Sequence, residues 1–151
     1  MIQRVQTFYL LISFVIITLI LFFPFFEFNA GKYIFDCFKI SETTDNDINL
    51  IKNSYPLGIL ISIILLLHLV AVFTFKKRGL QLRITVFTII LLIGFYGLLA
   101  FYRFVMLDFE IISTKYSFTL IIPLISSILV FLANRKIKKD DELVKSADRI
   151  R

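Results

Sequence analysis

Four long apolar runs constrain this chain more than any other feature of its sequence. None of them contains Asp, Glu, Lys or Arg, and they cover about residues 5–26, 55–75, 84–102 and 117–134. A helix needs about 20 residues to cross a hydrocarbon layer of about 30 Å. Strands of a membrane barrel would alternate apolar and polar residues, and these runs do not. The sequence therefore predicts an all-α membrane protein with four transmembrane helices.

The composition favours burial in lipid over a water-soluble fold. Hydrophobic residues make up 58% of the 151 residues, and 18 residues are Phe. Soluble domains contain about 45–50% apolar residues. A soluble domain of this size also has too much surface to hide so many aromatic rings from water. We expect a single membrane domain over residues 1–151.

The distribution of Lys and Arg predicts the orientation of the helices. If the N-terminus is cytoplasmic, twelve of the 17 Lys and Arg residues lie inside the cell and five lie outside. Because cytoplasmic loops carry an excess of these residues, we expect both termini in the cytoplasm and an up-down-up-down bundle. The positive charge gathers at the ends of the spans. The net charge of +6 therefore does not indicate a nucleic-acid partner.

The segment between the first two runs, residues 27–54, is the larger outside loop. Residues 33–40 predict either a short strand or a segment lying on the headgroups, and residues 42–47 have the polar composition of a turn. Cleavage of the first run as a signal peptide would leave three helices. We expect the run to be retained, because it is about twice as long as the apolar region of a signal peptide.

The spans contain no recognisable catalytic, cofactor or metal motif, so we expect neither an enzyme nor a bound cofactor. His68 is the intramembrane candidate. It is either a hydrogen-bonding residue of the bundle, which we favour because no carboxylate lies in any span, or a functional group. Cys37 either pairs with another chain or, as we favour, stays a free thiol. Gly94 and Gly97 indicate close packing within the bundle.

The cytoplasmic tail, residues 135–151, carries most of the sequence detail outside the spans. Its basic beginning, RKIKK, is typical of an anchor at anionic headgroups, and Asp140 or Asp141 would suit the start of a separate helix. Leu143, Ala147 and Ile150 recur at helical spacing. We predict that a protein partner binds the cytoplasmic face. The candidate residues are Arg4, Arg135, Lys138, Lys139, Leu143, Ala147, Asp148, Arg149, Ile150 and Arg151.

The chain opens with MIQRVQTFYLL and closes with LANRKIKKDDELVKSADRIR. These two ends resemble an uncharacterised family of four-helix inner-membrane proteins from Bacteroidota, domain of unknown function 4293, and the resemblance extends over essentially the whole chain. It implies a multi-pass protein of the bacterial inner membrane. It implies no particular activity.

Together these features favour a non-enzymatic scaffold or accessory subunit that engages a protein partner through its cytoplasmic face and charged tail. The alternative is a small transporter or channel that works as an oligomer. For that role His68 and the region around Gly94 and Gly97 are the intramembrane candidates. Membrane lipids are the other expected partners.

Overall fold

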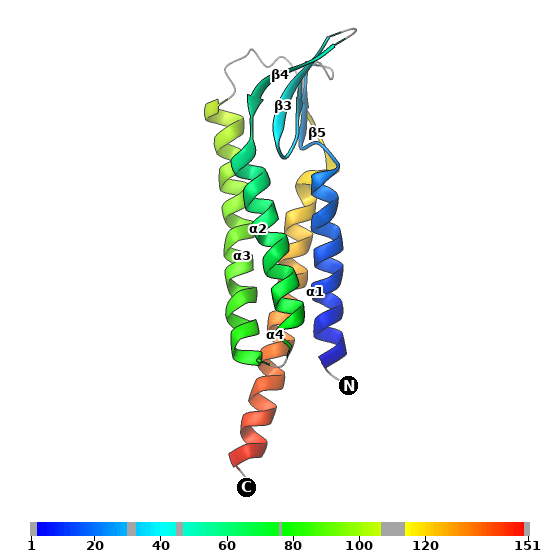
Figure 1. The fold of residues 1–151 in the computed structure, drawn as a ribbon. Coiled ribbons are helices and arrows are strands. Elements are labelled where there is room, and N and C mark those ends of the chain that lie inside the picture. Colours follow the sequence, from blue (N-terminus) through cyan, green and yellow to red (C-terminus); the bar gives the residue numbers. More distant parts are fainter. Residues whose placement is uncertain (1–2, 30–32, 45–46, 76, 107–113, 150–151) are drawn as a thin grey trace.

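The computed structural model describes residues 3–29, 33–44, 47–75, 77–106 and 114–149. Four helices form an antiparallel bundle with a small sheet across one end (Figure 1). α1 begins at the opposite end of the bundle, and α4 leaves the bundle at that same end. The elements are α1 (Gln3–Thr18), η1 (Leu19–Leu21), β1 (Phe26–Phe28), β2 (Tyr33–Phe35), β3 (Lys39–Thr44), β4 (Asp47–Asn53), α2 (Tyr55–Phe73), α3 (Arg78–Phe101), η3 (Tyr102–Met106), β5 (Thr114–Tyr116), η4 (Phe118–Ile121) and α4 (Ile122–Arg149).

Three helices are long and apolar enough to cross a membrane: Tyr55–Phe73, Arg78–Val105 and Phe118–Val144. These helices indicate that the chain is a membrane protein. The first apolar helix, Val5–Leu21, is shorter, and its 17 residues span about 26 Å. Its predicted range of 5–26 was too long. Pro24 cannot continue a helix, and Phe26 already belongs to β1.

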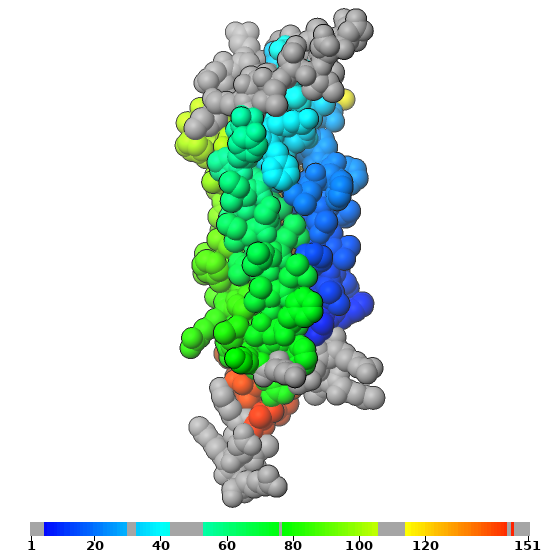
Figure 2. Space-filling model, viewed as in Figure 1, coloured from blue at the N-terminus to red at the C-terminus, as the bar shows by residue number. Residues whose placement is uncertain are grey.

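The helices bury one narrow face and expose large apolar side chains on the other. In α2 the buried positions Leu57, Ile61, Ile64, His68 and Ala71 recur every three or four residues. Only about a third of each membrane-crossing segment is buried inside the protein (33%, 28% and 33%). Exposed apolar surface of this extent is unfavourable in water and suits contact with lipid chains. Figure 2 shows one face of the bundle, on which α1, α2 and α3 lie side by side.

A five-stranded antiparallel sheet covers the end of the bundle opposite the termini, which the all-α prediction omitted. Its strand order is β4-β3-β2-β1-β5, so the last strand returns from the connection between α3 and α4 to pair with β1. Residues 33–40 were predicted to form either a short strand or a segment on the headgroups. In the structure they begin with β2 and end with the start of β3, and a turn connects the two strands. The polar segment 42–47 contains the β3–β4 reversal, where Thr44 pairs with Asp47; residues 45 and 46 lie outside the described part.

Aromatic rings join the sheet to the bundle. The Phe25 ring lies 6.0 Å from Phe35 in β2 and 5.6 Å from Phe95 in α3, measured between centroids. Phe26 stacks on Phe35 at 5.8 Å. The Arg103 guanidinium lies 5.1 Å from the centre of the Phe28 ring. The sheet is therefore part of the same core as the helices.

Two helix boundaries at the other end of the bundle differ from prediction. α3 begins at Arg78 instead of near residue 84, and Gly79 lies in its first turn. α4 runs without interruption from Ile122 to Arg149, so the tail is the continuation of the fourth span and not a separate helix beginning at Asp140 or Asp141. After Pro123 this segment contains no Gly or Pro, and most of its residues favour helix.

The ring cluster predicts the effect of shortening Phe95, which is fully buried. Phe95→Ala should lower the free energy of unfolding by about 3–5 kcal/mol, because it leaves a cavity between α3 and the sheet. Phe87→Ala on the same helix is the control, since Phe87 is 52% exposed. Unfolding in detergent micelles, followed by circular dichroism, measures both. Equal losses would contradict the assignment of Phe95 to the core.

Candidate functional site

The outward face of α4 changes character within one turn. Its large exposed side chains are apolar as far as Leu132, and the exposed residues that follow are Arg135, Lys136, Lys138 and Lys139. The next large exposed apolar side chains on this helix are Leu143 and Val144. The exposed surface of α4 therefore changes from apolar to cationic between Leu132 and Arg135.

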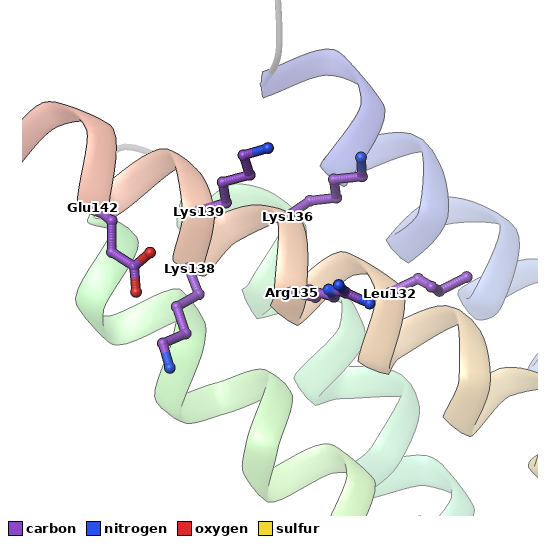
Figure 3. A pocket seen from close by; sticks show the side chains of 6 residues that line it. All are labelled: Leu132, Arg135, Lys136, Lys138, Lys139 and Glu142. Carbon is purple, nitrogen blue, oxygen red and sulfur yellow. The ribbon is translucent and has the colours of Figure 1, made fainter.

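A groove of about 670 Å³ lies at this change. Figure 3 shows the side chains that line it, all of them from α4: Leu132, Arg135, Lys136, Lys138, Lys139 and Glu142. We call it the basic groove. Four of its side chains are cations and one is an anion. None of the four cations forms an ion pair within the described part of the chain.

The opposite face of α4 is held to the start of α3. The Arg78 Nη2 atom lies 3.3 Å from Asp140 Oδ2, an ion pair without hydrogen-bond geometry. Six residues before Asp140 on α4, the side-chain amide of Asn134 donates a hydrogen bond to Thr85 Oγ1 at 2.7 Å. α4 is therefore anchored up to Asp140 and projects beyond it (Figures 1 and 2).

The predicted partner-binding residues fall into three groups. Arg135, Lys138 and Lys139 come together in the basic groove. Leu143 lies on the projecting part of α4 and is 51% exposed. For the remaining residues the structure gives less: Ala147, Asp148 and Arg149 belong to α4 and Arg4 to α1, without described side chains, while Ile150 and Arg151 lie outside the described residues.

His68 belongs to a buried hydrogen-bonded cluster that joins three helices. Its Nε2 atom lies 2.9 Å from Ser13 Oγ in α1, which lies 2.6 Å from Ser126 Oγ in α4. His68 Nδ1 lies 2.8 Å from the carbonyl oxygen of Ile64, which accepts only. In the neutral imidazole Nδ1 therefore carries the proton, Ser13 donates to Nε2, and Ser126 donates to Ser13.

This cluster has the atoms of a nucleophile and a base but no access for a substrate. Ser13 and Ser126 are 0% exposed and His68 is 1% exposed. The cluster therefore fits the hydrogen-bonding interpretation of His68. Sequence reasoning missed Ser13; a Ser within an uncharged apolar run was the available signal. Among the described residues, no group of three or more His, Cys, Asp or Glu side chains is placed to hold a metal ion.

Cys37 is a free, buried thiol between β2 and β3. Burial raises the pKa of this thiol to about 12, and the neighbouring Asp36 carboxylate adds to the rise. Burial also raises the pKa of Asp36, while Lys39 lowers it. A thiol that is both buried and protonated is a poor nucleophile.

Gly94 and Gly97 do not pack within the bundle, contrary to the prediction. Both are exposed, and a Cβ atom at either position would meet nothing within 4 Å. Gly58 is the glycine that permits a close approach, since a Cβ there would overlap the ring of Phe38. Gly58 lies in the first turn of α2, directly beneath the sheet.

The hydrogen-bonded cluster predicts that removing the Ser13 hydroxyl destabilises the bundle. Ser13→Ala should cost about 1–2 kcal/mol, because it leaves His68 Nε2 without a donor. Adding Ser126→Ala should cost little more, since both changes break one cluster. Ser62→Ala is the control, because this hydroxyl bonds only the Gly58 carbonyl of its own helix. Unfolding of Ser13→Ala, Ser126→Ala, the double variant and Ser62→Ala in micelles measures the coupling, and additive losses would contradict a shared cluster.

The buried thiol predicts slow alkylation of the folded protein. With a pKa of about 12, about one thiol in ten thousand is ionised at pH 8. We expect iodoacetamide to modify Cys37 at pH 8 only after the protein is unfolded, at a rate then typical of a free cysteine. The extent of modification is read by mass spectrometry. Rapid labelling of the folded protein would show that Cys37 is accessible and suited to pairing with another chain.

Comparison with known proteins adds one assignment. No curated protein and no solved structure matches the chain. The profile of one family matches residues 2–150, which is nearly the full length, and includes the apolar helices, the sheet and the continuous α4. The chain belongs to the family described as "Domain of unknown function (DUF4293)".

Proposed function

We propose that this protein is a non-enzymatic scaffold or accessory subunit of the bacterial inner membrane, which engages a protein partner through the projecting end of α4. In this orientation both termini and the basic groove face the cytoplasm, and the sheet lies on the other side of the membrane. The excess of Lys and Arg at the groove end supports the orientation. In this arrangement the shorter first helix, Val5–Leu21, also crosses the membrane, which gives four crossings in all.

The projection of α4 is the observation that carries the proposal. Beyond the Arg78–Asp140 pair, α4 continues for nine residues, or about 13 Å, to Arg149. Within the described residues no other element accompanies it (Figure 1). Leu143 and Val144 are 51% and 41% exposed there, below the basic layer and away from lipid. Exposed apolar side chains on a stable helix favour docking against another protein.

The alternative, an oligomeric transporter or channel, draws its support from the polar cluster of Ser13, His68 and Ser126. A transport site needs polar groups that reach water from each side in turn. These three side chains are fully or almost fully buried. They also satisfy one another by hydrogen bonds. The cluster therefore supports transport less than the projecting helix supports docking.

The proposal predicts that the projecting helix is needed for a partner and not for membrane insertion. We compare the full-length protein with one in which residues 143–151 are replaced by a Gly/Ser segment of equal length. Both are tagged between β3 and β4 and purified in mild detergent, and co-purifying proteins are identified by mass spectrometry. The expected result is a stoichiometric partner that is lost, by at least about ten-fold, with the helix.

Insertion and folding of the two proteins are compared by membrane fractionation and circular dichroism. If the same partner is retained after replacement of the helix, docking through α4 is wrong. If neither protein carries a partner, the transporter alternative gains weight. Flux into vesicles that disappears in His68→Ala would then support it.

A further inference from the structure

We infer that the basic groove binds an anionic phospholipid of the cytoplasmic leaflet, with the lipid phosphate among the cations and an acyl chain along α4. The inference rests on the orientation proposed above and does not require a protein partner. It assigns a ligand to the part of α4 next to the bundle and leaves the projecting part for docking.

The depth of the groove matches the headgroup layer. Leu132 lines the groove and is the last large exposed apolar side chain of α4 before the four cations. The helix rises about 4.5 Å from Leu132 to Arg135 and about 10 Å to Lys139. The headgroup region on each side of a bilayer is about 5–8 Å thick. Arg135 and Lys136 therefore lie within the headgroup layer, at the level of lipid phosphates, and Lys138 and Lys139 lie just beyond its cytoplasmic edge.

The charge of the groove calls for an anion. Four cationic side chains line it, although Lys138 points to the other side of α4 from Lys136 and Lys139 (Figure 3), and Glu142 is the one acidic side chain that lines it. The cations make no ion pair within the described residues. The planar Arg135 guanidinium can donate two parallel hydrogen bonds to a phosphate, and the lysines add compact positive charge. Lysines and arginines at an anionic membrane surface each strengthen association roughly five-fold.

The apolar half of the same face distinguishes a lipid from a soluble anion. Ile121, Ile125, Ile128 and Leu132 are exposed and recur at three- or four-residue spacing. Residues at this spacing share one face of a helix, and Arg135 and Lys139 continue the same series. One uninterrupted surface therefore offers apolar contact at hydrocarbon depth and positive charge directly beneath it. A phospholipid has both parts in this order, whereas free phosphate or an acidic protein has only one.

Native mass spectrometry of the full-length protein, released from a neutral detergent, tests the inference. Phosphatidylglycerol and phosphatidylcholine with identical acyl chains are titrated separately, and bound lipids are counted. We compare the double variant Arg135→Gln/Lys139→Gln with the control Lys77→Gln/Arg83→Gln. The control removes two exposed cations from the same end of the bundle but outside the groove.

We expect the unaltered protein to retain one phosphatidylglycerol in preference to phosphatidylcholine. The groove variant should bind it about ten- to thirty-fold more weakly, and the control variant less than about three-fold more weakly. Excess inorganic phosphate should not displace the lipid. Replacement of residues 143–151 should leave lipid binding unchanged, so that the lipid site and the docking proposal can fail separately.

Three results would overturn the inference. The first is equal binding of the two lipids. The second is an equal loss in both double variants, which would indicate a diffuse positive surface. The third is loss of a co-purifying acidic protein from the groove variant without loss of lipid, which would assign the groove to that protein.

Discussion

The absence of water along most of the bundle is the constraint on which the rest of this structure depends. In lipid each backbone polar group must be paired within its own segment, so the apolar runs are helical whatever their content of Ile and Val. The outward faces then need no polar covering, and only about a third of each long helix is buried (33%, 28% and 33%). The polar groups that do lie inside, such as Ser13 and His68, bond one another because no other partner is available.

The sequence predicted the helices well and the sheet end of the bundle poorly, for a physical reason in each case. A run without charges determines a membrane helix almost alone, so the second and third segments were placed correctly to within a few residues at most ends. The strands β1, β2 and β5 have three residues each. Such short strands show no alternation, and they exist because they pair with segments distant in the chain, as Phe26 pairs with Tyr116. Their pairing partners could not be found from local sequence.

The candidate site was also predicted in part: its basic residues were identified from the sequence, and the continuous helix that carries them was not. The basic residues Arg135, Lys138 and Lys139 were identified from their position after an apolar run, and they do share one groove. The tail was nevertheless expected to begin a new helix, because Asp140 reads as a helix start when charge alone is considered. In the structure its carboxylate faces Arg78 at the beginning of α3. That contact joins residues 62 positions apart, and no local pattern reveals it.

The continuity of α4 joins the projecting end of this protein directly to its membrane helices. A tail joined through Gly or a loop would keep its own orientation whatever the membrane helices did. Here one helix carries the hydrogen bonds of Ser126, the basic groove and Leu143. A change in the tilt of α4, produced for example by a thinner bilayer, is therefore transmitted to the projecting end. With about 13 Å of helix beyond the last ion pair, a tilt of a few degrees moves that end relative to the membrane surface. Bilayer thickness and the position of the projecting end are linked through this single element.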